Sequence, residues 1–171
     1  FVHPFDDLQV IEGQATIGLE MIKQIDENLD YLFVAVGGGG LIAGVSSVFK
    51  LQSPKTKVIA VEAFGAAALN ETIAQNRIVK LEKIDSFADG IAVKQIGTLA
   101  FQILKNNIDD AIKIHEGQIC STILELYNEE AIVVEPAGAI SVSALEQYKD
   151  QIKGKRVGII ICGGNNDISR T

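Results

Sequence analysis

Short apolar runs alternate with amphipathic stretches along most of this chain. The runs at 31–36, 58–61 and 156–161 predict strands buried on both faces of a parallel sheet, and 111–114 predicts a further brief strand. Apolar residues recur at helical spacing between them. The predicted helices are 13–24, 41–50, 66–74, 96–105, 116–127 and 136–148, while 76–91 has neither period and is expected to be a mixed, loop-like segment.

The order of these elements predicts the fold class. A strand, a helix and a second strand between 31 and 61 form a crossover unit, and the alternation continues to the end of the chain. We therefore expect an α/β fold: a three-layer, mostly parallel twisted sheet with helices on both faces. Glycine-rich loops follow Val36 and Ile161, at the carboxyl ends of two predicted strands. Ligands of such sheets bind at that edge, so both loops should border one cleft.

Four consecutive glycines, Gly37 to Gly40, join the first strand to the following helix. Such a loop presents several unblocked backbone N–H groups to one point, with the positive end of the helix dipole behind them. A flexible connection would not require the backbone-entropy penalty of four glycines. The close approach of a ligand is the better interpretation, and the loop predicts a phosphate-binding site.

Composition and charge limit the alternatives. With 171 residues, 47% of them hydrophobic and 22% charged, the chain can bury one sizeable core. The net charge of −7 offers no basic stripe, which argues against nucleic acid. The widely separated Cys120 and Cys162 fit a reducing compartment, so we expect a cytoplasmic protein. Neither they nor His3 and His115 have metal-ligand spacing, so no metal is expected.

The uncharged stretch 31–49 is long enough to raise the question of a membrane-spanning helix. Its central glycines would make a poor helix, and a strand, loop and helix account for the same apolarity. We therefore expect no membrane association.

The same loop also permits a dinucleotide. Gly38, Gly40 and Ala43 match a G-x-G-x-x-A spacing, and Glu62 ends the next strand, where a ribose-binding acid is wanted. Any run of four glycines supplies the first two positions, which weakens the match. An NAD-dependent oxidoreductase remains an alternative, and so does a non-catalytic binding domain.

Several ordered motifs together carry a resemblance to a known family. They are 36–41 (VGGGGL), 135–139 (EPAGA) and 161–165 (ICGGN), with 1–6 (FVHPFD), 12–14 (EGQ) and 87–94 (FADGIAVK). In these motifs the chain resembles the large domain of the fold type II pyridoxal-phosphate enzymes, and within them the biosynthetic threonine dehydratases (threonine ammonia-lyases). The resemblance covers essentially the whole chain.

The resemblance implies pyridoxal 5'-phosphate as the cofactor and an amino acid, threonine or serine, as the substrate. The implied reaction dehydrates and deaminates L-threonine to 2-oxobutanoate and ammonia, the first step of isoleucine biosynthesis. A full-length member would be a homo-oligomer. The residues that would contact the cofactor are Gly37, Gly38, Gly39, Gly40 and Leu41 at its phosphate, and Cys162 beside its pyridine nitrogen.

The resemblance also implies that much of the enzyme lies outside this chain. Residues 1–171 would be the C-terminal part of the large catalytic domain. The small domain, the segment with the Schiff-base lysine and a C-terminal regulatory domain would be absent. The chain opens on Phe1 rather than Met, as expected of a piece of a longer protein. We predict no catalytic residue here and no activity for the chain alone.

Two further residues are interpreted through the same resemblance. Glu135 is either an active-site acid or a negative charge that complements the helix starting at Pro136, and we favour the second. Serine-acting relatives with a divalent ion carry a second carboxylate six residues after the strand-end acid. Here that position is Ala68, so a metal site is not expected.

Overall fold

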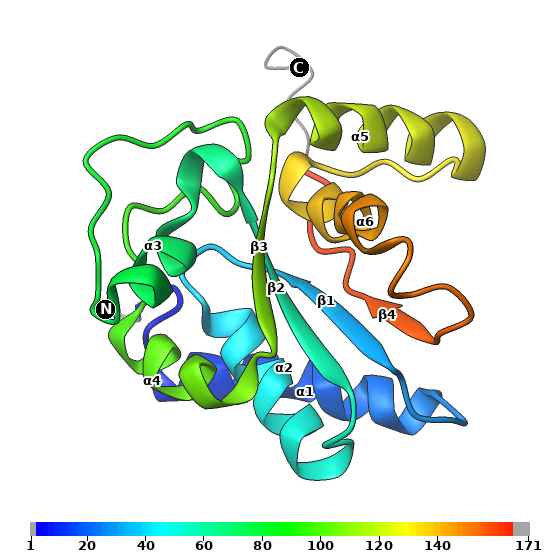
Figure 1. Ribbon diagram of the computed structural model, residues 1–171, viewed down its shortest axis with the longest axis horizontal. Coiled ribbons are helices and arrows are strands. Elements are labelled where there is room, and N and C mark those ends of the chain that lie inside the picture. Colours follow the sequence, from blue (N-terminus) through cyan, green and yellow to red (C-terminus); the bar gives the residue numbers. More distant parts are fainter. Residues whose placement is uncertain (1–2, 166–171) are drawn as a thin grey trace.

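The structure is a computed structural model that describes residues 3–165 (Figure 1). The elements follow one another as a regular alternation of helices and strands. In chain order they are α1 (Leu8–Gln24), β1 (Tyr31–Ala35), α2 (Gly40–Gln52), β2 (Lys57–Ala63), the 3-10 helix η1 (Phe64–Ala66), α3 (Ala68–Gln75), α4 (Thr98–Asn107), β3 (Asp110–Ile114), α5 (Glu116–Glu130), α6 (Pro136–Tyr148) and β4 (Val157–Ile159).

The described strands form one parallel sheet in the order β3-β2-β1-β4. Leu32 and Val34 of β1 belong to a core packed by α1, α2 and α4. Phe33, between them, points to the opposite core, which α5 and α6 cover. Figure 1 shows these two groups of helices on opposite sides of the sheet. The predicted three-layer α/β architecture with a parallel sheet is confirmed.

The path of the chain creates a switch point beside β1. From β1 the chain moves through α2 to β2 and then to β3, on one side of β1. It returns through α5 and α6 to β4, which pairs with the other side of β1. In open parallel sheets, ligands bind outside the carboxyl ends of the strands at a switch point. Both glycine loops leave the sheet here, after β1 and after β4.

Differences from the predicted elements have local causes. Helix α1 begins at Leu8 rather than at 13, because the Asp7 side chain caps it by accepting a hydrogen bond from the Gln9 N–H at 2.8 Å. The predicted helix 66–74 is divided at Ala67, whose backbone is not helical. The predicted strand 156–161 is only three residues long, since its pairing with β1 ends at Ile159.

Candidate functional site

A cavity of about 380 Å³ lies at the carboxyl ends of β1 and β4. All six predicted cofactor-binding residues line it, so the structure brings the two glycine loops together. The lining residues are Pro4, Phe5, Val10, Gln14, Ala35, Gly37, Gly38, Gly39, Gly40, Leu41, Gly90, Ile91, Val93, Glu135, Ala137, Cys162 and Gly163.

The first glycine loop delivers the start of α2 to this cavity. Gly39 has a φ of 93°, in the left-handed region that favours glycine, and it is the N-cap of α2. It has no side chain, and no side-chain cap hydrogen bond is present at this helix end. The first amides of a helix have no partner within the helix, and they carry its positive dipole end. Backbone donors of Gly40 and Leu41 therefore suit an anionic group in the cavity.

The protein itself explains why these positions are glycines. A Cβ atom on Gly38 would overlap the ring of Phe5, and one on Gly37 would lie 2.8 Å from the Cα of Ile91. The sequence argument attributed the missing side chains to the approach of a ligand. Close packing against Phe5 and Ile91 is a sufficient cause, so the case for an anion rests on the uncapped α2 and the cavity.

Cys162 follows β4 and forms part of the opposite wall. Its thiol donates to the Ala137 carbonyl, with 3.7 Å between Sγ and oxygen. Burial raises the pKa of the Cys162 thiol, and the Glu135 carboxylate acts in the same direction. The thiol is therefore neutral at neutral pH. A neutral thiol offers a weak hydrogen bond and no negative charge.

Glu135 lines the cavity as well as starting α6. It is the N-cap residue of α6, but its side chain makes no cap hydrogen bond. Instead, its carboxylate accepts a hydrogen bond from the Asn165 N–H at 3.0 Å. It also lies so close to Gly90 that a Cβ there would be 2.7 Å from Oε1. The interpretation of Glu135 as a charge for α6 alone was incomplete, because the side chain supports the second loop.

Several other residues that line this cavity could not be assigned to the site from the sequence. Phe5 and Gly90 stand within motifs that carried the family resemblance, and that was the available signal. Gln14 stands within another of these motifs, 12–14, whereas Val10 comes from the first turn of α1, where helical spacing alone gave no reason to single it out.

Glu62 is fully buried. Its Oε1 accepts from the Leu69 N–H, and Oε2 accepts from the backbone N–H and side-chain amide of Asn70, each at 2.8 Å. Burial raises the pKa of Glu62 to about 7, although these hydrogen bonds and Lys113 act in the opposite direction. The carboxyl group thus holds the start of α3 and is not exposed to a ribose, so the dinucleotide alternative lacks its acid.

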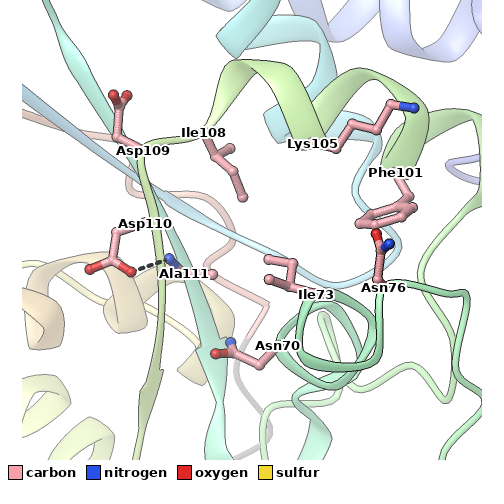
Figure 2. Close-up of a pocket in the computed structure, with 9 residues that line it drawn as sticks. All are labelled: Asn70, Ile73, Asn76, Phe101, Lys105, Ile108, Asp109, Asp110 and Ala111. Carbon is pink, nitrogen blue, oxygen red and sulfur yellow. Dashed lines mark hydrogen bonds between the residues drawn. The ribbon is translucent and has the colours of Figure 1, made fainter.

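A second cavity, of about 390 Å³, lies between α3, α4 and the start of β3 (Figure 2). Ile73, Phe101 and Ile108 contribute apolar side chains to its lining, and the polar side chains around them are those of Asn70, Asn76, Lys105, Asp109 and Asp110. It is at the amino end of β3, away from the glycine loops, and contains no predicted site residue.

Two other properties concern only the part of the chain that the structure describes. Within 3–165, no three His, Cys, Asp or Glu side chains gather as metal ligands would. No helix in this range is long and apolar enough to cross a bilayer.

A parallel sheet with an uncapped helix start and a glycine loop at its switch point defines an α/β protein of the class that binds a phosphorylated cofactor. Comparison with known proteins gives the family. The family model described as pyridoxal-phosphate dependent enzyme matches residues 1–163, and the chain belongs to this family. The cavity fits that cofactor, since backbone donors for its phosphate and the small side chain of Cys162 line the same space.

Relatives by sequence are biosynthetic L-threonine dehydratases. That of Halalkalibacterium halodurans is 51% identical over 170 residues and that of Staphylococcus aureus is 52% identical over 174 residues. Each match covers 99% of this chain but only 41% of the relative, so the chain spans about two fifths of their length.

Solved structures with a similar fold include a threonine deaminase and a serine racemase. The processed form of threonine deaminase isoform 2 from Solanum lycopersicum matches with a TM-score of 0.94 and 37% identity, over 99% of this chain and 50% of that one. Serine racemase from Dictyostelium discoideum matches with a TM-score of 0.88 and 38% identity, over 98% of this chain and 53% of that one.

Proposed function

We propose that residues 1–171 are the C-terminal part of the large cofactor-binding domain of a pyridoxal-phosphate-dependent threonine ammonia-lyase. The complete enzyme would convert L-threonine to 2-oxobutanoate and ammonia, the first step of isoleucine biosynthesis. The observation that carries this proposal is the meeting of Gly37–Leu41 and Cys162 at one cavity beside the switch point. The identity of about half of all residues to biosynthetic L-threonine dehydratases supports the choice of reaction.

In this proposal the main-chain amides of Gly37–Leu41 would bind the cofactor phosphate, and Cys162 would face the pyridine nitrogen. When bound, the cofactor supplies an electron sink for the electrons released at the substrate Cα. The neutral thiol cannot hold a proton on the nitrogen as a carboxylate would, so the sink stays moderate. That property suits elimination better than transamination.

The rest of the proposed machinery belongs to the complete polypeptide. We infer that the small domain, the Schiff-base lysine and a regulatory domain lie there, and that the enzyme is a cytoplasmic homo-oligomer. The chain alone would be inactive.

The test is an absorbance spectrum and a 2-oxobutanoate assay on the full-length polypeptide, with and without added pyridoxal phosphate. We expect a visible cofactor band, and turnover of threonine that is lost on cofactor removal and restored by its addition. Binding of the cofactor without turnover of threonine or serine would leave a binding domain. Binding of NAD in place of pyridoxal phosphate would favour the oxidoreductase.

A further inference from the structure

The segment from His3 to Asp6 connects the first glycine loop to α4, although these parts are far apart in the sequence. His3 Nδ1 accepts hydrogen bonds from the N–H groups of Phe5 and Asp6, at 3.4 and 2.8 Å. The rings of His3 and Phe5 meet edge to face, with centroids 4.7 Å apart. The segment therefore has a defined shape that fixes where the Phe5 ring and the Asp6 carboxylate lie.

Asp6 caps a helix that lies more than ninety residues away in the sequence. The N-cap residue of α4 is Gly97, which has no side chain to offer. Asp6 accepts hydrogen bonds from the N–H groups of Thr98, Leu99 and Ala100, at 2.9, 2.8 and 3.2 Å. A carboxylate at a helix start satisfies its orphan donors and complements its dipole. Asp6 thus attaches the segment firmly to α4.

Phe5 and α4 hold the glycine loop from two sides. The Phe5 ring fills the space beside Gly38, and the backbone carbonyl oxygen of Phe5 would be 2.8 Å from a Cβ on Gly40. From the side of α4, the Gly97 N–H donates to the Gly38 carbonyl at 2.9 Å. One closed set of contacts therefore links the loop, Phe5, Asp6 and the start of α4.

We propose that Phe5 and Asp6 are positioning residues of the phosphate site: Phe5 presses the glycine loop into shape, and Asp6 fixes Phe5 to α4. This inference rests on the proposed cofactor function of the loop. Neither side chain needs to touch the phosphate, because both act through the backbone of Gly38 and Gly40. A loop held in advance binds its ligand more tightly than one that must be ordered on binding.

The test compares two variants with two matched controls in the full-length polypeptide. Asp6→Ala removes the three cap hydrogen bonds at the start of α4, and Asp7→Ala removes the single side-chain cap bond of α1, which Asp7 accepts from the Gln9 N–H. Phe5→Leu trims the ring at the glycine loop, and Phe101→Leu trims a half-buried ring at the second cavity. The measurements are the Kd values for inorganic phosphate and pyridoxal phosphate, and ligand-free amide hydrogen exchange at 37–41.

We expect Asp6→Ala and Phe5→Leu to weaken both ligands and speed exchange at 37–41 by about fivefold to tenfold, as for loss of one helix cap. The controls should change neither quantity by more than about twofold, even where they lower the melting temperature equally. Equal ligand affinities and equal exchange rates in all four variants would overturn the inference. A wild-type protein that binds neither ligand would overturn the proposed function, while the exchange data would still decide whether the loop is braced.

Discussion

Replacing Gly39 by alanine should lower the stability of the fold and weaken phosphate binding, although alanine adds only one methyl group. At a φ of 93°, an L-residue in the left-handed region costs about 1–2 kcal/mol. The new Cβ would also lie 2.8 Å from Ile96 Cδ1 and 2.9 Å from Ala100 Cβ, both in the core beneath α2. Overpacking of this kind adds about 1–3 kcal/mol. Moving the loop relieves the overlap, but it also displaces the amides that we propose bind the phosphate.

Gly154→Ala is the matched control. Gly154 also has a positive φ, 71°, but nothing lies within 4 Å of its Cβ position and it is not among the residues that line the cavity. The Gly154→Ala variant should lose only the free energy of unfolding that backbone strain costs, about 1–2 kcal/mol, and it should keep its affinity for phosphate.

Urea unfolding and phosphate titration of both variants separate these effects. We expect Gly39→Ala to be less stable than Gly154→Ala by at least about 1 kcal/mol and to bind inorganic phosphate at least about tenfold more weakly. Equal stability losses with unchanged phosphate affinity in both variants would refute the reasoning.

Other predictions concern the rest of the fold. The pKa of Glu62 in the folded protein, about 7, exceeds its ordinary value of 4.5. The contribution of Glu62 to the free energy of unfolding is therefore complete below pH 4.5, and it falls by about 3 kcal/mol as the pH rises through 7. Urea unfolding across this range should show that loss in the wild type and not in Glu62→Gln; parallel curves would contradict it. Gly13→Ala, inside α1 with open space around it, should raise stability by about 0.5–1 kcal/mol, and a fall would show a contact that the structure lacks. Tyr148→Phe removes the hydroxyl that donates to Asp110 and should lower stability by about 1 kcal/mol in the same assay, whereas no change would show that this bond is matched by water.

The sequence predicted what local pattern controls. The continuous apolar run of β1 and the proline at the start of α6 determined those elements, and the two loops were placed at one edge by parallel topology. Asp6 was beyond reach, because its partners are at 98–100 and nothing near it signals a helix cap. Glu62 was ambiguous, since a strand-end acid looks the same whether it faces a ribose or, as here, the start of α3. Only its burial distinguishes the two.

The central claim is that both glycine loops border one pyridoxal-phosphate site. It is tested most directly by alkylating the full-length polypeptide with N-ethylmaleimide, with and without the cofactor, and following Cys162 and Cys120 separately by mass spectrometry. Cys162 lines the cavity, whereas Cys120 lies on α5 and is not among the lining residues. At a cofactor concentration about ten times Kd, alkylation of Cys162 should slow by about tenfold and that of Cys120 should not change. Equal rates at Cys162 with and without bound cofactor would contradict the account.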